Sequence, residues 1–261
     1  MRKIQRSQIF ITGDKHRNYK SVIQFCHQNK TTFEDILIIL GDAGFNYYGD
    51  RRDEKLKDKL SRCRVTLFCI HGNKENRPQN IDTYETKIFH NDYVYYEKKY
   101  PNLLFAHDGG VYEFDGKSAI VLGGAHSVDK NFRINNNLPW WEDEIPTTEV
   151  KKEFVTALQN RDNQIDYILT HTVPLKYEPV EMFLSQQKKK KHIWGNRIRN
   201  RTSNLNFEPD INKDLEKWLD KIEERTQYQK WYAGHYHTDK CIEKLRIMYH
   251  DIQILGSDSY E

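Results

Sequence analysis

Residues 35–42 read Asp-Ile-Leu-Ile-Ile-Leu-Gly-Asp, and this stretch decides the class of fold. A continuous apolar run from Ile36 to Leu40 is typical of a strand buried on both faces, as in a parallel sheet covered by helices. The run stops at Gly41-Asp42, which puts a carboxylate at the carboxyl end of the strand. Ligand sites in α/β sheets gather at these ends, so the stretch predicts both an α/β fold and a place for its site.

Two further strands of the same kind are expected at residues 8–12 and 65–70. The first ends at Gly13-Asp14 and the second at His71-Gly72-Asn73. Apolar residues at helical spacing over 18–29, and a charged segment over 53–62, predict the helices between these strands. The first third of the chain is therefore predicted to consist of βα units.

The middle of the chain changes to short strands, expected at 103–106, 111–114 and 118–122. Asp108-Gly109-Gly110 and Asp115-Gly116 join them, and both turns indicate hairpins. Further elements are expected as a helix from Thr147 or Thr148 to 161, strands at 167–170 and 231–233, a helix at 210–222, and closing strands between 244 and 255. No repeat and no linker divides the chain, which predicts one domain over 1–261 with a basic insert at about 186–207.

Composition restricts the class of protein. Hydrophobic residues make up 37% of the 261 residues, enough for a packed core. No apolar run approaches the roughly 18 residues that span a bilayer, and the apolar stretch after the basic start is too short for a signal peptide. The four cysteines lack metal-site spacing, which favours free thiols in a reducing compartment. We expect a cytoplasmic protein without a membrane partner.

Candidate metal ligands stand in five loops, each after a predicted strand: Asp14 with His16, Asp42, Asn73, His171, and His235 with His237. Carboxylate, imidazole and amide-oxygen donors together suit divalent Mn, Fe, Zn or Ni. Two such ions about 3.5–4 Å apart can clamp the attacking and leaving oxygens of a phosphoryl displacement. The loops therefore predict a two-metal centre for phosphoester chemistry.

The ligands and their order resemble the motifs of the calcineurin-like metallophosphoesterase superfamily, from about residue 9 to residue 239. The resemblance implies a four-layer αββα sandwich with two central mixed sheets. It implies one ion held by Asp14, His16 and His237, a second held by Asn73, His171 and His235, and Asp42 bridging them. It also implies that a metal-bridging hydroxide hydrolyses a phosphomonoester or phosphodiester. Manganese is the expected metal, with iron, zinc or nickel as alternatives.

The chain departs from the family pattern at two positions. Lys74 stands where the family carries a His that protonates the leaving group, and Phe45 stands where an Asp orients that His. An unperturbed His titrates near 6.5 and an unperturbed Lys near 10.4, so the two are different acids at neutral pH. Three roles for Lys74 stay open: an alternative catalytic acid, a fixed positive charge beside the phosphoryl oxygens, or a residue that impairs turnover.

Substrate contacts are predicted around the same loops. Arg77 could grip a phosphate with its planar fork, and His126, Lys130 and Arg133 follow a glycine-rich turn after a strand, although a solvated loop explains those three equally well.

A basic segment suggests a different substrate. Lys188 to Arg201 contains no acidic residue and includes Trp194, which suits nucleic acid or a nucleotide. The net charge is only +3, so the chain as a whole does not resemble a nucleic-acid binder. Three functions compete: a metal-dependent phosphatase or phosphodiesterase, a nuclease or cyclic-nucleotide phosphodiesterase, and a metal-binding protein impaired in turnover by Lys74. No pattern indicates an oligomeric state.

Overall fold

The computed structural model describes residues 7–179 and 212–257. Its strands form two mixed sheets, one of seven strands and one of six. In both sheets the central strands run parallel and antiparallel strands are added at the edges. This confirms the predicted α/β class with two mixed sheets.

The seven-stranded sheet contains the predicted N-terminal units. Its order is β13-β1-β2-β3-β6-β5-β4, and β1, β2, β3 and β6 are parallel neighbours. The strands are β1 (Ile9–Thr12), β2 (Ile36–Ile39), β3 (Thr66–Cys69), β4 (Tyr84–Phe89), β5 (Asp92–Glu97), β6 (Tyr100–Ala106) and β13 (Ile252–Ile254).

The six-stranded sheet has the order β11-β12-β10-β9-β8-β7, with β12, β10, β9 and β8 parallel. The strands are β7 (Val111–Phe114), β8 (Lys117–Leu122), β9 (Gln164–Thr170), β10 (Gln227–Ala233), β11 (Lys240–Ile242) and β12 (Leu245–Ile247). The helices are α1 (Lys20–Asn29), α2 (Arg51–Leu60), α3 (Lys130–Asn135), α4 (Thr148–Gln159) and α6 (Asp214–Arg225), with short 3-10 turns at Pro78–Asn80 and Leu175–Tyr177.

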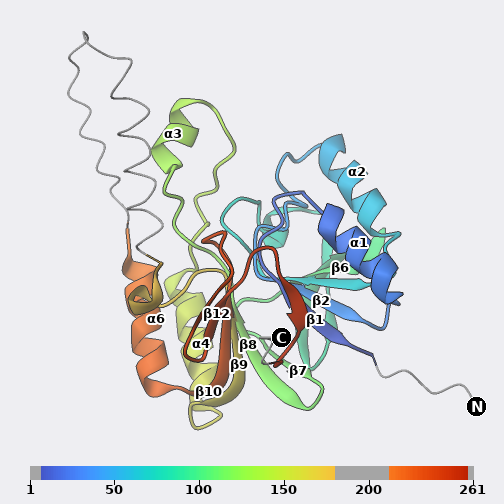
Figure 1. The fold of residues 1–261 in the computed structure, drawn as a ribbon. Coiled ribbons are helices and arrows are strands. Elements are labelled where there is room, and N and C mark those ends of the chain that lie inside the picture. Colours follow the sequence, from blue (N-terminus) through green and yellow to red (C-terminus); the bar gives the residue numbers. More distant parts are fainter. Residues whose placement is uncertain (1–6, 180–211, 258–261) are drawn as a thin grey trace, which may run out of the picture.

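Three apolar clusters define four layers. Alternate residues of β2 serve two of them: Ile36 and Ile38 pack between the sheets, while Leu37 and Ile39 face outward with side chains from α1 and α2. The outer face of the other sheet packs on α4 and α6. Figure 1 shows these helices on the outer sides of the two sheets. The both-face burial predicted for residues 36–40 is thus explained by a helix layer on one side and a second sheet on the other.

The predicted hairpin at Asp108-Gly109-Gly110 is wrong. β6 belongs to the seven-stranded sheet and β7 to the six-stranded sheet, so this turn carries the chain between layers. Gly109 has φ +85°, and Gly110 N–H donates to His107 O at 3.1 Å, which closes a tight turn. The turn itself was therefore predicted correctly, but the pairing of its flanking strands was not. The hairpin predicted at Asp115-Gly116 is confirmed as β7 and β8.

Several elements differ from the sequence predictions. The pair β4–β5 and the helix α3 were not anticipated, and α6 begins and ends later than the predicted helix at 210–222. Thr147 caps α4 as expected, with its hydroxyl accepting from Val150 N–H at 3.3 Å. The basic insert at 186–207 lies outside the described residues.

The four cysteines are free thiols, and Cys26 and Cys69 are buried. Among the residues of 7–179 and 212–257, no helix is both long enough and apolar enough to cross a membrane.

Candidate metal centre

The predicted ligand loops meet where the parallel strands of both sheets end. Backbone hydrogen bonds connect them: His16 N–H donates to Asp42 O at 2.7 Å, and Gly234 N–H donates to His171 O at 3.0 Å. The first bond joins the loops after β1 and β2, and the second joins those after β9 and β10. His235 N–H, in the loop after β10, donates to Asp14 Oδ1, in the loop after β1, at 2.9 Å, so loops from the two sheets share one site.

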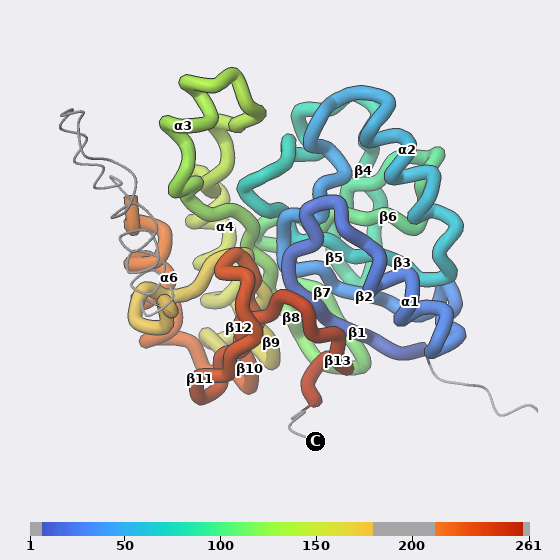
Figure 2. Tube along the Cα trace, turned by 45° about the horizontal axis from the view of Figure 1, so that its top comes forward, coloured from blue at the N-terminus to red at the C-terminus, as the bar shows by residue number. Residues whose placement is uncertain are grey.

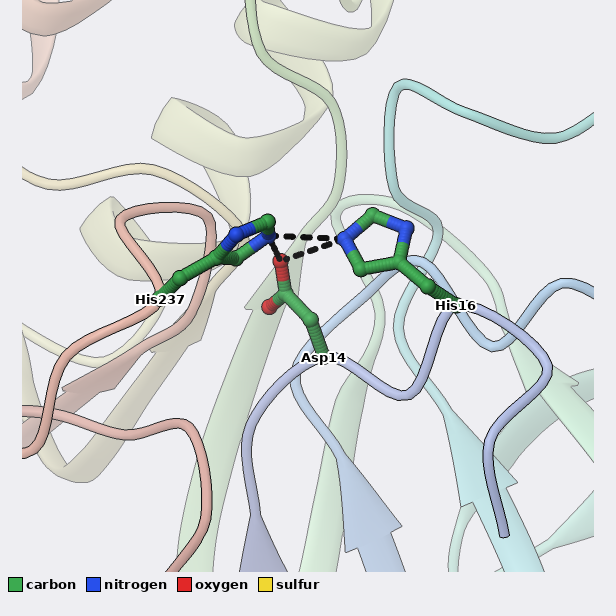
Figure 3. A group of neighbouring side chains, drawn as sticks. All are labelled: Asp14, His16 and His237. Carbon is green, nitrogen blue, oxygen red and sulfur yellow. Dashed lines mark hydrogen bonds and ion pairs between the residues drawn. The ribbon is translucent and has the colours of Figure 1, made fainter.

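The first group of donors consists of Asp14, His16 and His237 (Figure 3). The two imidazole Nε2 atoms are 2.7 Å apart, and Asp14 Oδ2 lies 3.6 Å from that of His16 and 3.2 Å from that of His237. Ligand atoms bound about 2.1 Å from one ion are about 3.0–3.4 Å apart. The separation of Asp14 Oδ2 from His237 Nε2 lies in that range and the other two lie within about 0.3 Å of it, so small shifts would bring the three atoms to one cation.

The second group consists of Asp14, Asp42 and His171. Asp42 Oδ2 lies 3.6 Å from His16 Nε2 and 3.8 Å from His171 Nε2, so this carboxylate stands between the two groups. Asn73 extends the second group, with its Oδ1 3.0 Å from His171 Nε2. Two groups that could each hold a metal ion therefore share Asp14, and Asp42 of the second group also approaches His16 of the first.

His235 joins the centre through its backbone. Its N–H donates to Asp14 Oδ1 at 2.9 Å, and its ring lies beside that of His171 with the centroids 5.1 Å apart. Burial, reinforced by the neighbouring His171, places the pKa of His235 well below its usual value. The ring is therefore neutral at neutral pH, which is the form that binds metals.

The chemistry of these donors fits a divalent metal. In the described chain, Asp14 Oδ2 is buried and accepts no hydrogen bond of ordinary geometry. His171 Nδ1 is 2.7 Å from Leu40 O and so carries a proton, which leaves the lone pair of the neutral ring on Nε2. That lone pair faces Asn73 Oδ1, another acceptor. Acceptors that face one another are stabilised by a shared cation.

Electrostatics favour the same state. Burial opposes ionisation of Asp14, but the imidazoles of His171, His16 and His237 outweigh it and hold its pKa well below the usual range. Asp14 is therefore a carboxylate at neutral pH. Burial, together with the charge of Asp42, raises the pKa of Glu75 to about 8, and its carboxyl oxygens accept from Ala43 and Gly44 N–H at 3.1 and 2.8 Å. Glu75 thereby orders the loop after β2.

The backbone at the site is strained. Asp42, His16, His235 and His237 have φ of 47°, 42°, 67° and 51°, a region that residues other than glycine rarely adopt. Such strain persists only where surrounding contacts impose it, and it concentrates at functional sites. The glycines serve a different purpose, because a Cβ on Gly72 would stand 1.9 Å from Asp42 Oδ1 and one on Gly41 2.0 Å from His171 Nδ1. They let the ligand side chains pass close to the neighbouring backbone.

Lys74 lies at the centre but is held by other residues. Its backbone N–H donates to Asp42 Oδ1 at 2.7 Å, while Nζ pairs with Asp129 and donates to Ser127 Oγ at 2.9 Å. Phe45 is fully buried and stacks on Tyr19, so it belongs to the core rather than to the site.

The predicted substrate contacts are engaged within the protein. Arg77 is buried, pairs with Asp108, and donates from Nε to Asp143 O at 2.8 Å. Arg133 Nε donates to Asp129 Oδ2 at 2.8 Å. Lys130 lies over the Trp140 ring at 4.2 Å, and His126 Nδ1 is 3.7 Å from Glu144 Oε1. The structure thus brings together ligand atoms of Asp14, His16, Asp42, Asn73, His171 and His237, with His235 beside them through its backbone and ring, while these four residues contact neighbouring protein groups.

Sequence reasoning missed Ser127 and Asp129, which contact the centre through Asn73 and Lys74. Both lie in the glycine-led segment after β8 that drew attention to His126, Lys130 and Arg133. Their position just after a strand end is the feature that could have identified Ser127 and Asp129. Only the fold shows which residues of this segment face the site.

Comparisons with known proteins give a likeness in solved structures alone. No protein-family model and no curated protein matches the chain. One crystal structure is 11% identical, with 95% of this chain and 97% of that chain covered and a TM-score of 0.47. The crystal structure of TT1561 of Thermus thermophilus is 9% identical, with 96% and 98% covered and a TM-score of 0.46. The protein of unknown function AQ665 from Aquifex aeolicus is 12% identical, with 66% and 82% covered and a TM-score of 0.33.

Proposed function

We propose that this protein is a metal-dependent phosphoester hydrolase of the calcineurin-like kind. The observation that carries the proposal is the position of Asp42, whose Oδ2 lies between His16 Nε2 at 3.6 Å and His171 Nε2 at 3.8 Å. A carboxylate between two sets of nitrogen donors is what a two-metal site requires. The strand-end motifs that resemble the superfamily support the same conclusion.

Each residue has a defined task in the proposal. Asp14, His16 and His237 would hold one ion, Asn73, His171 and His235 the other, and Asp42 would contact both. Bound manganese ions would polarise a phosphoryl oxygen and lower the pKa of a coordinated water. The chain orients the donors: Leu40 O fixes the proton of His171 on Nδ1, and Lys74 N–H holds Asp42 Oδ1 so that Oδ2 faces the imidazoles. The substrate class is a phosphomonoester or phosphodiester.

A second candidate is a protein that binds metals with little turnover. The observation in its favour is that Lys74 Nζ pairs with Asp129 and donates to Ser127 Oγ. These contacts occupy the ammonium group that would otherwise protonate the leaving group. Loss of a general acid costs about 10²–10⁴-fold in rate. The two candidates share the metal centre and differ in catalysis.

The test measures binding and hydrolysis in the same preparations. Metal-free protein is titrated with manganese, and release of p-nitrophenol is followed from p-nitrophenyl phosphate and its bis-ester, with and without chelator. Asp42→Asn should lose at least about 100-fold in rate, since the metals supply several kcal/mol of charge stabilisation. Asp82→Asn, at an exposed position, is the matched control and should behave like the wild type. Stoichiometric manganese without hydrolysis would favour the second candidate, and absence of binding would reject both.

A further inference from the structure

The segment after β8 reaches back to the metal centre. We call residues 125–144, which include α3, the α3 arm; Figure 2 shows α3 standing apart from the two sheets. Its base is fixed, because Ser127 is buried and its backbone N–H donates to Glu144 Oε1 at 3.1 Å. The arm therefore begins from a defined point beside the ligands.

The Ser127 hydroxyl contacts the side chains of two successive residues in the loop after β3. Its Oγ accepts from Asn73 Nδ2 at 2.8 Å and from Lys74 Nζ at 2.9 Å. Lys74 Nζ also pairs with Asp129, two residues farther along the arm. Asn73 and Lys74 thus hold the Ser127 hydroxyl, and Glu144 holds its backbone.

With Asn73 Nδ2 and Lys74 Nζ both donating to Ser127 Oγ, the Asn73 amide has one particular end toward the centre. With Nδ2 donating to Ser127, Oδ1 points at His171 Nε2, 3.0 Å away. When the His171 ring is in the neutral form that binds metals, its proton is on Nδ1 and both of these atoms are acceptors. An amide turned by a half rotation would instead donate Nδ2 to the His171 lone pair and would satisfy both groups without any ion. The two orientations therefore correspond to a metal-ready and a metal-independent site.

We propose that Ser127 is a positioning residue of the metal centre, which holds the Asn73 amide with its oxygen toward the ion. Lys74, fixed by Asp129, holds Ser127 in turn. This inference rests on the metal site of the proposed function and assigns Lys74 a task separate from proton transfer. Groups that orient metal ligands in this way typically contribute about 10–100-fold to metal affinity.

The test is a double-mutant cycle on manganese affinity, read by the electron paramagnetic resonance of free and bound ion. Ser127→Ala should weaken binding of the ion that Asn73 would hold by about 10–100-fold. Ser127→Thr keeps the hydroxyl and should retain most of the affinity. Ser118→Ala, which removes a hydroxyl that contacts Asp166 at 2.9 Å in the six-stranded sheet, is the matched control.

Asn73→Asp separates positioning from general support of the fold. A carboxylate presents an oxygen whichever way it turns, so it does not need Ser127 to orient it. Ser127→Ala should then cost little affinity in the Asn73→Asp background, whereas a loss of structure would weaken both backgrounds equally. Equal losses in the two backgrounds, or wild-type affinity in Ser127→Ala, would overturn the inference. Failure of the wild type to bind manganese would overturn the proposed metal centre itself.

Discussion

Gly72→Ala tests the geometry of the centre most directly. A Cβ at this position would stand 1.9 Å from Asp42 Oδ1, 2.2 Å from Asp42 N and 2.7 Å from Asp42 Cγ. Ordinary contact begins at 3.4 Å, so the loops after β2 and β3 would have to separate by about 1.5 Å. Two of the opposing atoms are on the Asp42 side chain, but one is backbone, so a rotamer change cannot relieve the overlap.

The expected loss is larger in metal binding than in stability. Overpacking of this kind costs typically about 1–3 kcal/mol of unfolding free energy. Metal sites tolerate deviations of about 0.2 Å in ligand distance, so a shift several times larger should remove the ion that Asp42 bridges. We expect the manganese stoichiometry to fall from two to one or none, and hydrolysis to fall with it.

The assay pairs denaturant unfolding with manganese titration. Gly116→Ala is the control: nothing lies within 4 Å of its Cβ position, but its φ of +77° strains any other residue by about 1–2 kcal/mol. The two variants should therefore lose similar stability, and only Gly72→Ala should lose metal. If Gly72→Ala binds two ions with wild-type affinity, the crossing of these loops at the metal centre is refuted.

Three further predictions concern other parts of the molecule. Lys74→His should speed hydrolysis of an alkyl phosphoester more than that of p-nitrophenyl phosphate, because an aryl leaving group needs little protonation; equal rates for both variants on both substrates would remove Lys74 from the mechanism. Arg77→Met should cost about 3–5 kcal/mol in denaturant unfolding, because it removes the cation from the buried pair with Asp108, while KM stays unchanged; a raised KM at unchanged stability would show that Arg77 contacts the substrate. Burial opposes ionisation of Asp166, but Ser118 and Lys117 donate to it and lower its pKa. The stabilising effect of Asp166 is therefore present above the unfolded pKa near 3.9 and is lost as pH falls through the lower folded value. Asp166→Asn should make the free energy of unfolding depend less on pH in this acid range. An unchanged pH dependence would contradict this assignment.

Much of the fold could be predicted because its central strands carry local signals. The run from Ile36 to Leu40 is apolar at every position, and burial on both faces is the physical reason. The hairpin β4–β5 was missed although His90 and Asn91 form its turn with φ of 49° and 79°, a pair that suits a two-residue hairpin loop. β4, at the edge of the sheet, and its neighbour β5 are largely polar or half-exposed, so neither has the continuous apolar run that marked the central strands.

The sequence by itself determined which residues end the strands, since the candidate ligands follow apolar runs and glycine directly precedes Asp14, Asp42, Asn73 and His235. Only the tertiary structure decided which of those residues meet. Asp42 lies between His16 and His171 because the two sheets pack face to face with their parallel strands ending at one edge.

The contacts around the ligands were equally invisible in the sequence. Arg77 joins Asp108 and Asn73 joins Ser127 across 31 and 54 residues of chain, and neither pair has a local pattern that would distinguish it from a solvated loop. The spacing of apolar residues along the sequence indicates which side of a helix or strand is buried. The partner that a residue finds depends on how separate elements pack, and that is a property of the whole fold.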